Sequence, residues 1–291
     1  MKTAGARAGW LPRLVVAPGL LLGLAFIYGL IAWNGYLSLS ASKLLPNYRF
    51  VGLAQYAALF ASERFHVAMQ NLAVFGPLFV GGSVLLGLLL AILLDQKVRA
   101  EGALRTIYLY PMAISFIVTG TAWKWILNPG LGIEHVVRGW GFEGFTFDWL
   151  VNPDRAIYCV VIAGVWQSAG FAMALFLAGL RGIDDAIIKA AQVDGASLPR
   201  IYLRIVLPSL GPVFFSALLV VSHLAIKSFD LVMALTAGGP GFATDLPATY
   251  MYATAFTRGQ IGLGAASATV MLATIAAIVV PYLYSELRAR R

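Results

Sequence analysis

A few polar side chains stand inside long apolar runs of the sequence, where they could bind a ligand or one another. Gln167 lies in one such run, and His223 lies in another, close to Lys227, Ser228 and Asp230. Polar groups in an apolar surrounding cost free energy unless they are paired, and those within membrane spans are commonly functional. Lys227 and Asp230 are three residues apart and could pair on one helix face. The pattern fits a binding site, and it equally fits a structural ion pair with His223 bonded to a neighbouring helix.

The sequence offers no pattern for catalysis. It contains neither a phosphate-binding G-x-x-x-x-G-K-[ST] loop nor an H-E-x-x-H zinc motif. His66, His135 and His223 are scattered, and the single cysteine, Cys159, lies within an apolar run, so neither a metal cluster nor a disulfide is expected. We therefore predict a protein that is not an enzyme and carries no metal or cofactor of its own.

The composition indicates a membrane protein. Hydrophobic residues make up 60% of the 291 residues and charged residues only 12%, about half the usual share. The mean hydropathy is +0.81. Six apolar runs have the length of about 20 residues that a spanning helix needs. They are Leu14–Leu37, Asn71–Leu94, Thr106–Leu127, Ala156–Leu180, Ser209–Phe229 and Ala265–Tyr284. The sequence therefore predicts an all-α membrane protein with six transmembrane helices, in a single domain over residues 1–291.

The distribution of basic residues sets the expected orientation in the membrane. Six spans place both termini on one side, and most of the 21 Lys and Arg residues fall on that side. Basic residues accumulate on the cytoplasmic loops of membrane proteins. We therefore expect a multi-pass membrane protein with both termini in the cytoplasm and lipid around its spans. The formal charge of +8 reflects this orientation and does not indicate nucleic-acid binding.

A polar segment between the fourth and fifth runs, residues 181–208, predicts a helix–turn–helix outside the membrane. Asp184 can cap a short first helix, Asp194-Gly195 is a turn signal, and Ser197 can cap a second helix. Pro208 is expected to end the second helix where the next apolar run begins. The charge distribution places this segment in the cytoplasm.

This polar segment resembles the coupling loop of binding-protein-dependent ABC transporter permeases, a motif that begins Glu-Ala-Ala. The matching positions are Ala190, Ala191, Asp194, Gly195, Ala196, Leu207 and Pro208, with Tyr202 where an aromatic residue is usual. Lys189 stands where the family has Glu. In that family the loop docks into a cleft of a cytoplasmic ATPase. The resemblance therefore implies an ATPase-coupling role for these residues and for the neighbouring Leu198.

Further matches resemble the carbohydrate-uptake class of these permeases, and among them the glucose/mannose type. Trp166-Gln167-x-x-Gly170-Phe171 precedes the coupling loop, and Phe229-Asp230-Leu231 follows it, ahead of a Gly/Pro-rich stretch. Family sugar contacts come from the helices on both sides of the loop. The residues that would form the substrate pathway combine aromatic faces with hydrogen-bonding groups, as sugar sites do. They are Trp166, Gln167, Phe171, His223, Lys227, Ser228 and Asp230.

The resemblance implies an importer of several subunits in the bacterial cytoplasmic (inner) membrane. This chain would be one permease beside a second, non-identical permease. Two cytoplasmic ATPases would hold ATP and Mg, and an extracytoplasmic binding protein would deliver the sugar. The alternative is a gradient-driven secondary transporter or channel, which would show an intramembrane acidic relay or inverted repeats, and neither is visible. A membrane-embedded enzyme would need a clustered catalytic set that the sequence lacks.

Overall fold

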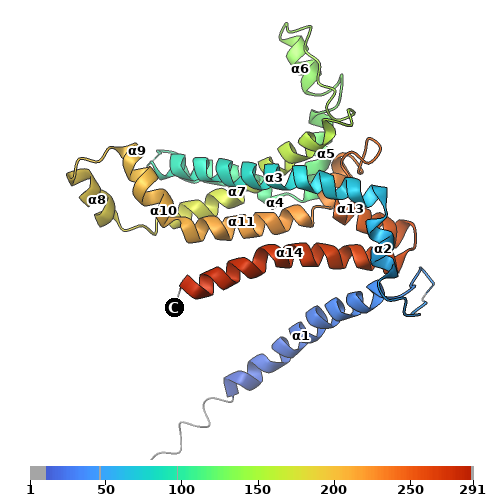
Figure 1. Cartoon of the computed structure of the whole chain (residues 1–291). Coiled ribbons are helices and arrows are strands. Elements are labelled where there is room, and N and C mark those ends of the chain that lie inside the picture. The colour runs from blue at the N-terminus through green and yellow to red at the C-terminus, as the bar shows by residue number, and fades with distance from the viewer. Residues whose placement is uncertain (1–10, 46, 97, 290–291) are drawn as a thin grey trace, which may run out of the picture. The chain divides into compact units, whose positions relative to one another are not determined.

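The computed structural model describes residues 11–45, 47–96 and 98–289, and the described chain is almost entirely helical (Figure 1). The α-helices are α1 (Leu11–Ser38), α2 (Ala54–Phe60), α3 (Glu63–Asp95), α4 (Glu101–Ala113), α5 (Phe116–Ile126), α6 (Ile133–Gly139), α7 (Ala156–Leu180), α8 (Asp185–Val193), α9 (Leu198–Ile201), α10 (Leu207–Ser209), α11 (Gly211–Ile226), α12 (Asp230–Leu235), α13 (Pro247–Tyr252) and α14 (Ile261–Ala289). Two π-helical turns, η1 (Tyr202–Val206) and η2 (Ala253–Thr257), interrupt this series. In the described residues, β pairing is limited to one antiparallel bridge between Ser40 and Phe50. The all-α prediction is confirmed.

The six predicted spans are present, two of them as bent pairs of helices. Four single helices, α1, α3, α7 and α14, are long and apolar enough to cross a membrane. The helix α7 begins and ends at the predicted residues, Ala156 and Leu180. The pair α4 and α5 bends by 100°, and the helix Leu198–Ser209 bends by 64° against α11. Among the described residues the count is therefore four, or up to six when each bent pair is taken as one span.

The third predicted span, Thr106–Leu127, is broken at Ile114, whereas the sequence predicts a continuous helix. Ile114 is extended, with φ −87° and ψ 142°. Val118 N then donates to Ser115 Oγ at 3.3 Å, which caps the start of α5. Pro111 lies one turn earlier and removes a backbone donor near the end of α4. The serine within the apolar run is therefore a helix cap.

The fifth predicted span, Ser209–Phe229, also differs from the sequence prediction. The expectation that Pro208 ends the helix is wrong, because Pro208 lies inside α10, directly after the π turn η1. Pro208 has no N–H to donate, and the π turn η1 directly before it is where the helix departs from α-helical hydrogen bonding. The chain bends at Leu210 instead, and α11 ends at Ile226, before the predicted boundary.

Contacts divide the chain into two compact units, which we describe separately. One unit contains the described residues up to Ala61 together with Met251–Val270. The other contains Ser62–Tyr250 together with the chain from Met271 onward. A single permease domain over residues 1–291 stays a prediction.

In the first unit, the C-terminal half of α1 is tied to the start of α14. Asn34 Nδ2 donates to Ala265 O at 3.2 Å and to Thr269 Oγ1 at 3.0 Å. Large apolar side chains along α1 remain exposed, among them Val15 at 74% and Phe26 at 64%. Such a surface suits a helix surrounded by lipid.

The second unit is held together by close contact between α3 and α7, which run side by side with α11 in Figure 1. Small residues permit this contact. A Cβ added at Gly87 would lie 2.5 Å from Ala172 Cβ, and one added at Gly164 would lie 2.8 Å from the Phe79 ring. This packed pair is the frame against which the broken helix α4–α5 and the coupling segment are placed.

Candidate functional sites

The coupling segment, residues 181–208, folds as the predicted helix–turn–helix. Asp184 caps α8, because its Oδ1 accepts a hydrogen bond from Ala186 N at 2.8 Å. Ser197 is the residue before α9, but its side chain makes no capping hydrogen bond. The predicted side-chain cap is therefore confirmed for Asp184 and wrong for Ser197.

The turn between α8 and α9 depends on the backbone conformation of Gly195. This residue has φ +76°, the left-handed region that favours glycine. Gly195 N donates to Gln192 O at 3.0 Å, and Ala196 N donates to Ala191 O at 3.0 Å, which ends α8 in the usual glycine-terminated manner. No atom lies within 4 Å of the position that a Cβ on Gly195 would take. The turn therefore requires glycine for its φ angle, and steric room plays no part.

The coupling segment exposes only part of the face that the resemblance assigns to ATPase docking. Lys189, Ala190 and Leu198 are exposed, whereas Ala191 is buried in a cluster with Ile201. Ala191 therefore packs inside the coupling segment and is not part of its exposed face. Among the other coupling residues, Asp194, Gly195 and Pro208 are exposed, and Ala196, Tyr202 and Leu207 are half-buried.

A side-chain hydrogen bond ties the coupling segment to α3. Gln96, the residue that ends α3, donates through Nε2 to Tyr202 Oη at 2.7 Å, across 106 residues of sequence. Burial, and after it the Asp95 carboxylate, raise the pKa of the Tyr202 phenol. The Tyr202 oxygen accepts the bond, which connects the coupling segment to the end of α3.

An ion pair joins the start of α4 to the first residue of the coupling segment. Glu101 lies in the first turn of α4, and Arg181 directly follows α7. The two form an ion pair, with Arg181 Nη2 2.6 Å from Glu101 Oε1. Arg105 Nη1 lies 3.9 Å from the same carboxylate oxygen. The helix dipole favours a negative carboxylate at the start of a helix and a positive guanidinium at its end. Sequence reasoning missed this cluster, because Arg181 and Glu101 are far apart in the chain.

A cavity of about 250 Å³ lies beside the α4–α5 break. We call it the first cavity; it is lined by Met112, Phe116, Gln167, Ser168, Phe171, Val220 and Leu224. Gln167 is 3% exposed, and its Nε2 donates at 2.7 Å to Ile114 O, a carbonyl at the break. Its Oε1 is buried without a partner. A buried acceptor without a partner is costly, so the Gln167 amide is held here at a free-energy cost.

A smaller cavity of about 60 Å³ adjoins the first. This second cavity is lined by Phe79, Phe116, Leu224, Lys227, Ser228, Phe229, Asp230 and Leu231. Lys227 follows the end of α11 and Asp230 begins α12, so they do not share a helix face. No ion pair within 4 Å joins these two described residues, so the expected pairing is wrong. Both charges instead line the second cavity.

The structure brings five of the seven expected pathway residues to these two cavities. Gln167 and Phe171 line the first, and Lys227, Ser228 and Asp230 line the second. The other two lie outside both linings. Trp166 packs edge-on against Trp123, with ring centroids 5.9 Å apart, and His223 is half-buried elsewhere on α11.

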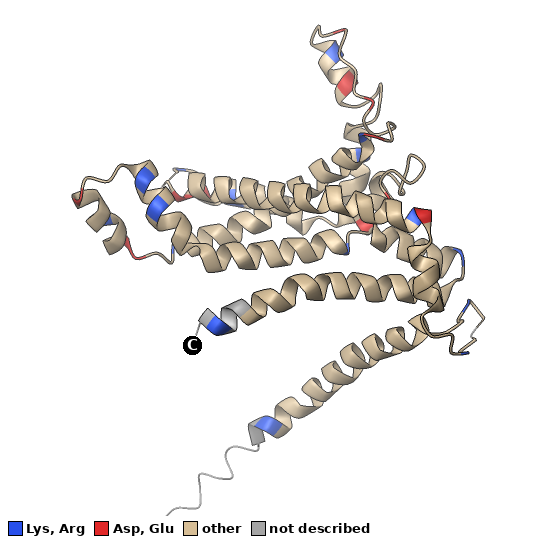
Figure 2. Cartoon of the chain, viewed as in Figure 1, with Lys and Arg blue, Asp and Glu red and all other residues tan. Residues whose placement is uncertain are grey.

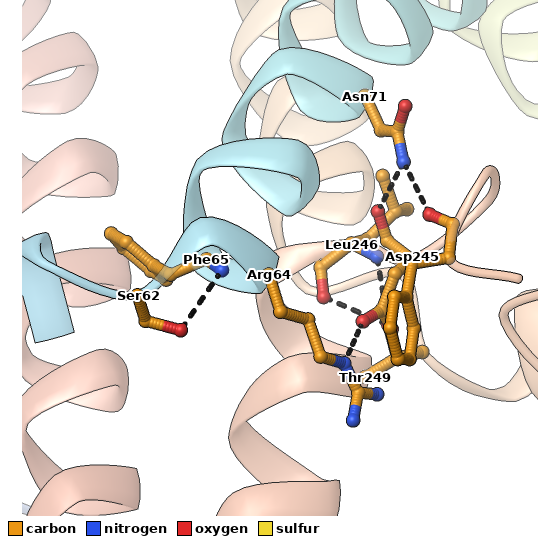
Figure 3. A network of polar contacts seen from close by, with 8 residues as sticks. Ser62, Arg64, Phe65, Asn71, Asp245, Leu246 and Thr249 are labelled. Atoms are coloured by element: carbon orange, nitrogen blue, oxygen red, sulfur yellow. Dashed lines mark hydrogen bonds and ion pairs between the residues drawn. The ribbon is translucent and has the colours of Figure 1, made fainter.

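A buried polar network fixes the loop between α12 and α13 to the start of α3 (Figure 3). Asp245 is 1% exposed and accepts from Arg64 Nε at 2.6 Å and from Thr249 Oγ1 at 2.6 Å. Asn71 Nδ2 donates to Asp245 O at 2.9 Å and to Phe242 O at 3.1 Å. The Arg64 guanidinium also lies 4.4 Å from the centre of the Phe242 ring. Asn71 at the start of a predicted span was a local signal, but the sequence could not pair Arg64 with Asp245, which lies 181 residues away.

Comparison with known proteins decides the family. Residues 83–290 match the family described as binding-protein-dependent transport system inner membrane component. The chain belongs to this family. The permease is 41% identical to a probable ABC transporter permease of Pyrococcus horikoshii, over 93% of this chain and 94% of that one. It is 39% identical to the xylose/arabinose import permease protein XacH of Haloferax volcanii, over 92% of this chain and 85% of that one.

The fold of the permease is also known from a solved structure. A bacterial ABC transporter involved in the import of the acidic polysaccharide alginate aligns with a TM-score of 0.84 and 22% identity, over 98% of both chains. The permease is thus a multi-pass transport subunit of the inner membrane and not an enzyme. The alternative of a gradient-driven transporter or channel is not supported.

Charge in the permease is concentrated at helix ends and in connecting segments. In Figure 2 the long helices α3, α7 and α11 are almost wholly free of Lys, Arg, Asp and Glu, as spans are. Among the described residues, no three His, Cys, Asp or Glu side chains come close enough to hold a metal ion.

Proposed function

We propose that the permease admits a neutral sugar through the two adjoining cavities, as one subunit of an ABC importer. The observation that carries this proposal is the lining of the first cavity, in which every side chain is uncharged and two, Gln167 and Ser168, are polar. The likeness to a xylose/arabinose import permease over most of the chain supports the same substrate class.

The chemistry of the linings favours a neutral ligand over an acidic one. Sugar sites combine apolar surface for C–H faces with a few hydrogen-bonding groups. In the first cavity, Phe116 and Phe171 supply the apolar surface, and Gln167 and Ser168 supply the hydrogen-bonding groups. An anionic saccharide would be expected to meet an excess of basic groups, yet Lys227 in the second cavity is accompanied by Asp230. The narrower assignment to a glucose/mannose-type permease stays a prediction.

Transport would be driven from the coupling segment. In the proposed importer, two cytoplasmic ATPases bind ATP and Mg. One of them receives the exposed face of α8 with Lys189 and Ala190, together with Leu198 at the start of α9. Lys189 replaces a family Glu, so its contact on the ATPase would be acidic or carbonyl-rich. A second, non-identical permease and an extracytoplasmic binding protein complete the assembly. Both termini and the coupling segment face the cytoplasm in this proposal.

The proposal is tested with the assembled transporter. The permease is purified from its native membrane, and an ATPase is expected to co-purify. Uptake of labelled D-xylose, L-arabinose and D-glucose is then compared with uptake of D-glucuronate. Uptake of a neutral sugar that requires ATP, and that falls in a Gln167→Leu variant, is expected. Preferential uptake of the acid would reject the neutral-sugar assignment, and a permease without an ATPase would reject the whole proposal.

A further inference from the structure

A groove runs between α11 and the second half of α14, apart from the two pathway cavities. Its volume is about 290 Å³. We call it the α11–α14 groove; it is lined by Phe215, Leu218, Leu219, Ile278, Pro281 and Tyr282. The rings of Phe215 and Tyr282 lie 6.0 Å apart between their centroids. All of these residues belong to one of the two compact units, so the groove is a feature of that unit alone.

The surroundings of this groove are apolar. None of its lining side chains is charged, and the sequence of α14 contains no charged residue from Ile261 to Ser285. Phe215 is 52% exposed and Ile278 is 40% exposed, although both lie on helices of predicted spans. Water does not fill an apolar cavity, and a spanning helix faces hydrocarbon. The occupant of the groove is therefore itself apolar.

The size of the groove distinguishes between apolar occupants. A single turn of α-helix, ~10 Å across and ~5.4 Å long, would fill roughly 420 Å³. This exceeds the groove volume of about 290 Å³. A helix of another subunit could therefore enter only with its side chains, whereas an acyl chain is thin enough to lie along the groove.

The face of α14 that lines the groove continues to a basic residue. Ile278, Pro281 and Arg288 follow at spacings of three and seven residues, which places them on one side of a helix. Arg288 is exposed, and its guanidinium lies 5.9 Å from the centre of the Tyr284 ring. In Figure 2 basic residues on α14 occur only at this end of the helix.

The distance from the groove to Arg288 matches one leaflet of a bilayer. Arg288 follows Ile278 by ten residues, or ~15 Å along a helix. One leaflet contributes about half of the ~30 Å hydrocarbon layer. A lipid with its phosphate at Arg288 would therefore place the end of its acyl chain near Ile278.

We propose that the α11–α14 groove binds one anionic phospholipid. Its acyl chain lies between the two helices, and its phosphate pairs with the Arg288 guanidinium, which suits phosphate oxygens. Because α11 begins directly after the coupling segment, the lipid belongs to the leaflet beside that segment. Only the naming of this leaflet as cytoplasmic depends on the proposed function.

The test uses photoreactive lipids and the whole transporter. The probe is phosphatidylglycerol with a diazirine near the end of one acyl chain, and the matching phosphatidylcholine is the comparison. The transporter is placed in phosphatidylcholine nanodiscs that contain either probe at low mole fraction. After illumination, mass spectrometry locates the labelled peptides. Label is expected on the peptides that contain Leu218, Leu219 and Ile278, about fivefold more from phosphatidylglycerol, the factor that one basic residue near a membrane contributes.

Two variants separate the headgroup contact from the groove. Arg288→Gln is expected to reduce phosphatidylglycerol labelling about fivefold, to the level of phosphatidylcholine. Arg13→Gln, at an exposed position of α1, removes the same charge elsewhere and should have no effect.

Ile278→Trp fills the groove and should reduce labelling by both lipids. The matched control is Leu272→Trp, because Leu272 is exposed on the same helix and does not line the groove. If Ile278→Trp fails to assemble, Leu219→Trp fills the groove from α11 and should give the same loss.

Two results would overturn the lipid site. Equal labelling by both lipids, unchanged in Arg288→Gln, would mean ordinary boundary lipid only. Absence of label from the groove in the assembled transporter would mean that a second permease covers it. Labelling does not require a transported sugar, so either result leaves the proposed function standing, and failure of sugar uptake leaves the lipid site standing.

Discussion

Gly195 is a position of the coupling segment that restricts the residue type to glycine, because of its backbone conformation. Its φ of +76° is costly for any side chain with a Cβ, and most costly for a β-branched one. Empty space around the missing Cβ means that a substitution would act through the backbone alone. The Asp194-Gly195 pair predicted this turn correctly, because turn chemistry is local.

Replacement of Gly195 by valine should uncouple transport. The strain of a left-handed backbone is about 1–2 kcal/mol for a residue with a Cβ, enough to shift the turn that sets α8 against α9. Sugar uptake is expected to fall strongly while assembly with the partner permease is retained. Gly195→Asn is the matched control, since Asn tolerates this conformation, and should keep most uptake. Normal uptake by Gly195→Val would contradict the prediction.

Gln167 shows both the reach and the limit of reading single residues. Its position inside an apolar run predicted a special role, and it does line a cavity. The sequence could not show that one amide atom is committed to Ile114 O while the other is free. Trp166 and His223 were also expected to line the pathway, but they lie outside both cavity linings. The sequence does not show which face of a span points toward a cavity.

At the scale of elements, the hydrogen bond between α3 and the coupling segment offers a second test. Tyr202→Phe and Gln96→Leu each remove this bond. Each is expected to raise the ATP consumed per sugar transported about twofold, as loss of a modest hydrogen bond allows. The double variant should be no worse than either single one. ATP hydrolysis and uptake are measured together in proteoliposomes.

The control for that cycle is Tyr28→Phe, on an exposed part of α1. This variant removes a tyrosine hydroxyl outside the coupling segment. The ATP consumed per sugar transported should stay unchanged. If the effect of the double variant equals the sum of the two single effects, Gln96 and Tyr202 act separately.

The buried pair between α3 and the α12–α13 loop should contribute strongly to stability. Arg64→Leu leaves Asp245 charged and buried, at a cost of up to about 3–5 kcal/mol. The Arg64→Leu, Asp245→Asn double variant should recover part of that loss. Thermal unfolding of the purified transporter measures both. Arg155→Leu is the control, because its pair with Asp148 at 3.7 Å is largely exposed and should contribute little.

Helix breaks are the elements that sequence predicted least well. Apolar length located every span, since the bilayer imposes it. It could not distinguish Ser115 as a cap from a small residue tolerated within a span, nor show that α10 continues through Pro208. Each depends on which hydrogen bonds the surrounding helices supply, and those contacts are not local.

At the scale of the whole molecule, the orientation in the membrane can be tested with fusions. The charge distribution predicts cytoplasmic termini, and six spans place the loop that holds α6 outside. Alkaline phosphatase fused after Gly144 should be active, and fused after Arg291 it should be inactive. Green fluorescent protein at the same sites should give the opposite pattern. Activity of phosphatase at Arg291 would reverse the topology.

The length of α7 has a consequence for the lipid around the transporter. Its 25 residues carry no charge from Ala156 to Leu180, and at 1.5 Å each they extend about 38 Å. A hydrocarbon layer of about 30 Å would bury this length only with a tilt of roughly 35–40°. Thicker bilayers would reduce the mismatch and let the helix stand more upright. Acyl-chain length should therefore influence transport, even though no acyl chain enters the pathway.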